Sequence, residues 1–86
     1  MTYNGWTNWE TWMVYSWLTN EEGTYNYIMS MTSKVGGDYQ TYDLSKLIRE
    51  FVEEGNPLTT GMYADLLGGA LREVDYYEIA EHFLEE

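Results

Sequence analysis

The chain has 86 residues, no cysteine, and a formal net charge of -11 from fifteen acidic and four basic residues. A chain of this length forms one domain, over residues 1–86, and without disulfides its aromatic residues must supply much of the core. The charge exceeds the magnitude of about 2–8 that is usual for a small soluble domain. Such a surface repels nucleic acid and anionic membranes and attracts basic proteins.

All four tryptophans occur near the start, in and just before a first predicted helix over residues 8–19. Asn4-Gly5 tolerates positive φ and predicts a turn, and Thr7 and Glu10 have the spacing of a capping box, which places the start of the helix at about Asn8. At helical spacing Trp9, Trp12, Met13 and Trp17 fall mainly on one face, so we favour core packing over an exposed aromatic platform. The expected structural core, on which the other helices pack, is Trp6, Trp9, Trp12 and Trp17.

Four further short helices complete a predicted all-α fold. Asn20 can cap the second, and the third runs over about 38–54 with apolar residues at i, i+3 and i+4 before the stop signal Gly55-Asn56-Pro57. The fourth begins near residue 59 or 60, and its apolar residues repeat the same spacing, which predicts an amphipathic helix. It contains Gly68-Gly69, which indicates either a close approach by another helix or a bend, since each glycine costs about 1 kcal/mol relative to alanine.

The fifth predicted helix begins at a second capping box, formed by Asp75 and Glu78. Its predicted core face consists of Tyr76, Ile79, Ala80, Phe83 and Leu84. The only histidine, His82, lies near its end, where its charge would complement the helix dipole. No nucleophile elbow, phosphate-binding loop or metal-binding motif occurs in the sequence. We therefore expect a protein that is not an enzyme, with no catalytic residue, cofactor or metal.

Acidic residues are concentrated in the last fourteen positions, which contain no lysine or arginine. Along the fifth helix Glu78, Glu81 and Glu85 fall on one side. The third helix adds acids that pairs such as Lys46–Glu50 and Arg49–Glu53 partly neutralise. These carboxylates form either a partner-binding face or a merely solvated one, and the candidate residues are Glu73, Asp75, Glu78, Glu81, Glu85, Glu86, Glu50, Glu53, Glu54 and Asp43.

Four stretches, over residues 3–12, 17–23, 64–67 and 74–82, resemble a family of small acidic proteins carried by phages, plasmids and other prokaryotic mobile elements. The first stretch fits the signature Tyr-Asn-Gly-Trp-x-Asn-x-Glu-Thr-Trp of that family. The resemblance implies an origin on a mobile element more than an activity. Together with the absence of a signal peptide or an apolar spanning segment, it leads us to expect a cytoplasmic protein of a prokaryotic host cell.

Two functions fit this description. The first is an inhibitor of host defence, of the anti-CRISPR or anti-restriction type, whose carboxylates mimic DNA phosphates and occupy the basic groove of a nucleic-acid-binding protein or complex. The second is a small acidic adaptor or structural protein that binds its partner through apolar surface. Neither requires direct binding to nucleic acid or to a membrane, and either is compatible with a dimer. Electrostatic docking weakens with salt, whereas apolar docking barely responds.

Overall fold

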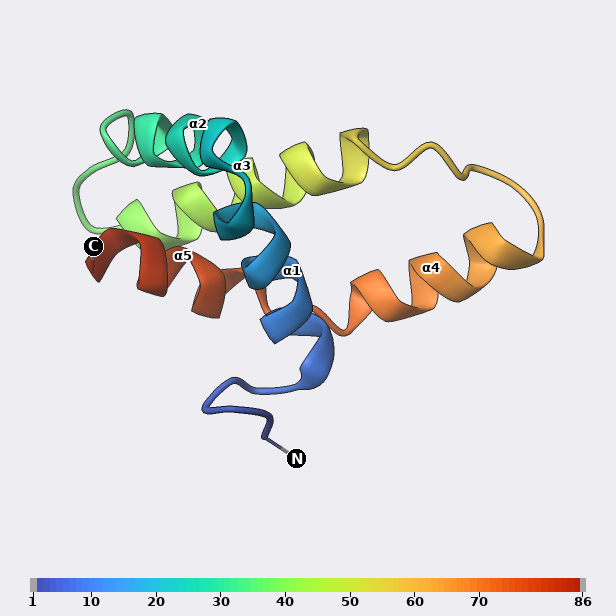
Figure 1. Ribbon diagram of the computed structural model, residues 1–86. Helices are drawn as coiled ribbons and strands as arrows, with labels where there is room; N and C mark the ends of the chain where they lie inside the picture. The colour runs from blue at the N-terminus through green and yellow to red at the C-terminus, as the bar shows by residue number, and fades with distance from the viewer. Residues whose placement is uncertain (1, 86) are drawn as a thin grey trace.

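A computed structural model describes residues 2–85 and contains five helices (Figure 1). They are α1 (Trp9–Asn20), α2 (Glu22–Thr32), α3 (Gln40–Glu54), α4 (Met62–Arg72) and α5 (Tyr76–Glu85). Within residues 2–85 no strand forms, and the sole extended pairing is the bridge between Tyr3 and Trp6. The all-α prediction with five helices is therefore confirmed.

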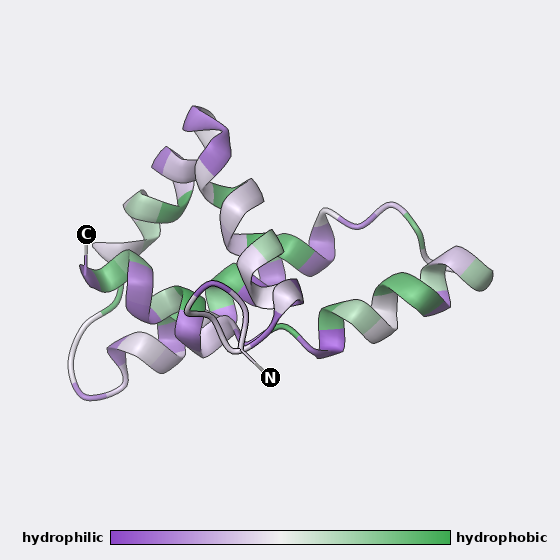
Figure 2. Cartoon of the chain, turned by 60° about the horizontal axis from the view of Figure 1, so that its bottom comes forward, coloured by the Kyte–Doolittle hydropathy of each residue, from purple (hydrophilic) through white to green (hydrophobic). Residues whose placement is uncertain are grey.

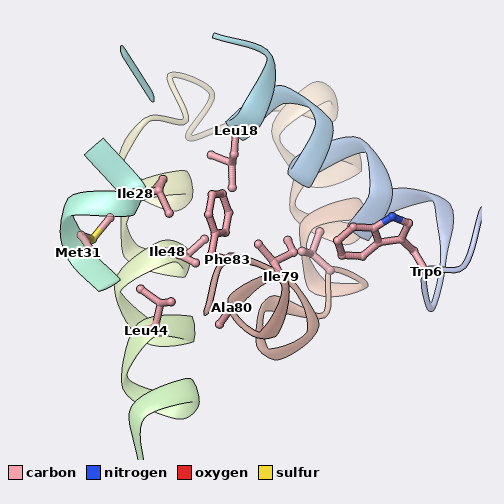
Figure 3. Close-up of a cluster of buried hydrophobic side chains, with 10 residues drawn as sticks. Trp6, Leu18, Ile28, Met31, Leu44, Ile48, Ile79, Ala80 and Phe83 are labelled. Carbon is pink, nitrogen blue, oxygen red and sulfur yellow. The ribbon is translucent and has the colours of Figure 1, made fainter. Parts of the chain in front are cut away.

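The core lies where α1, α2 and α3 meet α5 (Figure 3). Ile79, Ala80 and Phe83 of α5 are almost completely buried, and they face Leu44 and Ile48 of α3. These positions follow the helical periodicity of the sequence, which explains why the buried faces of α3 and α5 could be predicted. Ile28 and Met31 of α2 close the remaining side.

The prediction of a tryptophan core is wrong for two of the four tryptophans. Trp17 is 69% exposed and Trp9 is 47% exposed, whereas Trp6 is buried and Trp12 packs against the core with partial exposure. Apolar residues occur on all sides of α1, so periodicity alone cannot identify its inner face. That face carries the buried residues Thr11 and Leu18.

The predicted Asn4-Gly5 turn is present, with φ of 49° and 86° at these two residues. It is closed by two hydrogen bonds of 2.7 Å between the backbones of Tyr3 and Trp6. The turn directs the indole of Trp6 onto the imidazole of His82, with ring centroids 4.0 Å apart. The N-terminal segment therefore packs against α5.

The N-cap of α1 is Asn8, so the predicted capping box of Thr7 and Glu10 is wrong. Asn8 Oδ1 accepts hydrogen bonds from the backbone N–H and the hydroxyl of Thr11, and Asn8 Nδ2 donates to the carbonyl of Glu73 at 2.7 Å. The Thr11 hydroxyl in turn accepts from the backbone N–H of Asp75 at 2.9 Å. We call these four bonds the Asn8–Thr11 network. It joins the start of α1 to the segment that leads into α5.

The starts of α2, α3 and α4 differ from the sequence prediction by one to three residues, whereas α5 starts directly after the predicted cap Asp75. Glu21, and not Asn20, caps α2 by accepting from the N–H groups of Gly23 and Thr24. A hydrogen bond from the Thr24 hydroxyl, together with these two backbone bonds, lowers the pKa of the Glu21 carboxyl. Helix α3 begins at Gln40 without a side-chain cap. Helix α4 begins at Met62, after Gly61 with φ of 98°.

Helix α4 stands apart from the other four helices, at the end of the long loop that follows α3 (Figure 1). None of its residues is buried. The radius of gyration is 13.1 Å, compared with about 12 Å expected for a compact chain of this length. This separation rules out a close helix approach as the reason for Gly68-Gly69, because the nearest atoms to an added Cβ belong to the Arg72 guanidinium at 3.7–3.8 Å.

We expect Thr11→Val to lower the free energy of unfolding by about 1–3 kcal/mol, because it leaves the N–H of Asp75 without its acceptor while preserving side-chain shape. Thr19→Val is the matched control, since the Thr19 hydroxyl bonds only to carbonyls of its own helix. Urea denaturation of both variants measures the difference. Equal stability of the two variants would show that the network contributes nothing.

We expect Gly68→Ala and Gly69→Ala each to stabilise α4 by about 0.5–1 kcal/mol, because alanine is the better helix former and its Cβ would meet only ordinary contacts here. Far-ultraviolet circular dichroism should show equal or greater helix content, and thermal melting should shift upward. A loss of stability would indicate a close packing partner at these glycines.

Candidate partner-binding surfaces

The predicted acidic face of α5 is only partly available. Glu78 Oε1 accepts a hydrogen bond of 3.0 Å from the backbone N–H of Thr7, so this carboxylate anchors the N-terminal segment. Asp75 Oδ1 accepts from the N–H of Glu78, which confirms the capping role of Asp75 but not the reciprocal role of Glu78. Glu81 and Glu85 are exposed. Glu86 lies outside the described residues.

Among the other acidic candidates, Glu73 is exposed, and so are Asp43, Glu50 and Glu54 of α3. Glu53 forms the predicted ion pair with Arg49, with 3.0 Å between Arg49 Nε and the carboxylate. The predicted Lys46–Glu50 pair is absent from the ion pairs of residues 2–85. Lys46 Nζ instead lies 5.6 Å from the ring centroid of Tyr42.

An apolar groove separates α4 from the body of the protein. It has a volume of about 520 Å³ and is bounded by α1, by the end of α3 with the following loop, and by α4. Its walls contain one acidic residue, Glu54, and no basic residue. The lining residues are Met13, Val14, Trp17, Leu18, Phe51, Val52, Glu54, Gly55, Asn56, Pro57, Leu67 and Leu71.

Large apolar side chains continue from the groove onto the outer surface. Trp17 is 69% exposed on one wall, and on α4 Met62, Tyr63 and Leu66 are each 65–69% exposed. Figure 2 shows hydrophobic residues along much of α4. Exposed apolar surface of this kind marks an interaction site in proteins. The sequence pattern of α4 correctly indicated an amphipathic helix, but it could not show that no neighbouring helix covers the apolar side.

His82 lies in an aromatic cluster on α5. The imidazole is stacked on Trp6 and lies 5.6 Å from the ring of Tyr15, centroid to centroid. Within residues 2–85 no three histidine, aspartate or glutamate side chains gather in positions that could hold a metal ion. None of the helices in this part of the chain is long and apolar enough to cross a membrane.

The chain belongs to a family of unknown function, DUF7249, and the family's sequence profile matches residues 1–85. No curated protein and no solved structure matches the chain. Several residues near the N-terminus have structural roles: Asn4 and Gly5 form the turn, Trp6 packs on α5, and Asn8 and Thr11 form the network.

We expect Trp6→Ala to destabilise the protein by about 3–5 kcal/mol, as is usual for a buried tryptophan. Trp17→Ala should change the free energy of unfolding by no more than about 0.5 kcal/mol, because the indole is mostly exposed. Thermal melting of the two variants compares them directly. A large loss for Trp17→Ala would place that indole in a core that the present fold does not show.

Proposed function

We propose that this protein is a non-enzymatic binding protein that holds a basic, amphipathic segment of a partner protein in the apolar groove. The observation that carries the proposal is the exposure of Trp17 opposite an α4 that no other helix covers. Tryptophans in apolar pockets supply much of the binding energy of protein interfaces. An amphipathic helix laid in a hydrophobic groove is a recurring mode of recognition.

The net negative charge of the protein favours a basic partner. With a net charge of -11, a second copy of the chain is repelled and a basic segment is attracted. The groove itself carries Glu54 and no lysine or arginine to compete with a basic partner. Apolar contacts in the groove would then set the affinity, and the surrounding acids would speed association.

This proposal develops the adaptor hypothesis, and it is compatible with inhibition of a host defence complex. A protein of a phage or plasmid, acting in the cytoplasm of a prokaryotic host, can block a nucleic-acid-binding protein by occupying a basic helix of that protein. Apolar contacts supply specificity that phosphate mimicry alone lacks. The partner of either role is a basic nucleic-acid-binding protein or complex.

DNA mimicry is the second candidate function, and one observation favours it. Glu81 and Glu85 are exposed on a helix that contains no lysine or arginine. Glu78, however, accepts a hydrogen bond from the N-terminal segment. One of the carboxylates on which the mimicry hypothesis relies is therefore less available to a partner. Mimicry and groove binding can be separated because they use different residues.

We expect a synthetic amphipathic helical peptide of leucine and lysine to bind and to shift the indole N–H resonance of Trp17. The same peptide with glutamate in place of lysine should associate far more slowly at low ionic strength, because the acidic surface repels it. A groove variant, Trp17→Ala with Leu67→Gln, should lose at least about tenfold in affinity. Tyr39→Ala is the matched control, because Tyr39 is 73% exposed and lies outside the groove.

Pull-downs from a prokaryotic lysate extend this test to natural partners. A protein captured by the wild type and by Glu81→Gln with Glu85→Gln, but not by the groove variant, is a groove partner. Its retention should change little between low and high salt. If the groove variant keeps every partner and the glutamine variant loses them, the DNA-mimic function is correct and the groove proposal is wrong.

A further inference from the structure

Three of the four basic residues in this acidic chain lie together. Arg49 of α3 and Arg72 of α4 line two adjoining hollows of about 540 and 600 Å³, which also share Val74 and Tyr76. Lys46 of α3 lines the second of these hollows. We call this region the basic hollow. It lies beside the apolar groove, from which it is separated by Asn56 and Leu71, residues that border both.

Two of these bases have no carboxylate partner within residues 2–85, although the chain has fifteen acids. Only Arg49 is paired, with Glu53. The guanidinium of Arg72 lies beside Gly68 and Gly69, at 3.7–3.8 Å from the positions that added Cβ atoms would take. A cation that remains unpaired in so acidic a protein is available to an external anion.

Tyr76 supplies a third kind of group. Its hydroxyl is buried and has no hydrogen-bond partner within the described residues, and the residue lines both hollows. Burial, with a smaller contribution from Glu53, raises the pKa of Tyr76 to about 12. The hydroxyl therefore keeps its proton at neutral pH and can donate a hydrogen bond. Buried polar groups in proteins almost always have a partner.

Two of the three acids that border the basic hollow already have partners within the protein. Glu53 pairs with Arg49, and Asp75 Oδ1 accepts the N–H of Glu78 at the start of α5. Glu73 is exposed to solvent. More distant acids are screened, because the Debye length is about 8 Å at physiological ionic strength. The local balance therefore favours an anion even though the whole chain is acidic.

We propose that the basic hollow binds the phosphate group of a small molecule, either free phosphate or a phosphomonoester. A phosphate offers several acceptor oxygens at once, and two guanidinium forks, an ammonium and a hydroxyl supply donors from three elements of the fold. Such a ligand would link α3 to α4. This site is additional to the proposed function and does not depend on it.

Nuclear magnetic resonance titrations with inorganic phosphate and with glycerol phosphate test the proposal, with sodium chloride added to keep the ionic strength constant. We expect saturable shifts of the Arg49 and Arg72 side-chain N–H signals. Arg72→Gln should weaken binding at least about tenfold, and Tyr76→Phe should weaken it less, since a charged hydrogen bond is about twice as strong as a neutral one. Saturation by glycerol phosphate as well as phosphate identifies a phosphomonoester site, and saturation by phosphate alone identifies a site for the free ion.

Lys34→Gln is the matched control, because Lys34 is the one base outside the hollow. It removes the same charge as Arg72→Gln and should leave binding unchanged. Tyr76→Phe should fold normally, since the hydroxyl has no partner among the described residues. Shifts that never saturate, or equal losses in Lys34→Gln and Arg72→Gln, would overturn the proposal.

Discussion

The hydroxyl of Thr11 is the contact on which the orientation of α1 depends. It is completely buried, it donates to Asn8 and it accepts from the N–H of Asp75, so it holds the start of α1 against the entrance to α5. Once Thr11 faces inward, helical geometry places Leu18, two turns later, on the same side. Trp17 must then point outward. A single buried polar contact thus decides which tryptophan is available to a partner.

The periodicity of the apolar residues was sufficient to predict the buried faces of α3 and α5. Leu44 and Ile48 of α3, and Ile79 and Phe83 of α5, are buried as their spacing indicated. Periodicity failed for α1, because its apolar residues surround the helix and the inner face is chosen by a threonine that no hydrophobicity scale would select. Asn8 could have been recognised as the cap, since asparagine ranks among the best N-cap residues.

For the acidic residues, composition predicted the charge of the surface but not the contacts of each carboxylate. Net charge correctly predicts an anionic surface, but it cannot show which carboxylates are already bound. Glu78 anchors Thr7 and Glu53 pairs with Arg49, whereas Glu81 and Glu85 remain exposed. The apolar groove could not be predicted at all, because it exists only through the position of α4 relative to α1 and α3.

Helix α4 forms a wall of both the apolar groove and the basic hollow, so a ligand in either site would affect the stability of this helix. It has eleven residues, two of them adjacent glycines, and none of them is buried. Isolated helices shorter than about 12–15 residues are marginal in water, and each internal glycine weakens them further. The order of α4 must therefore come from contacts outside the helix. In the proposed function the partner supplies these contacts on the side of Leu67, while a phosphate bound at Arg72 would supply them on the side of α3. Because both ligands would stabilise the same helix, binding of one should favour binding of the other.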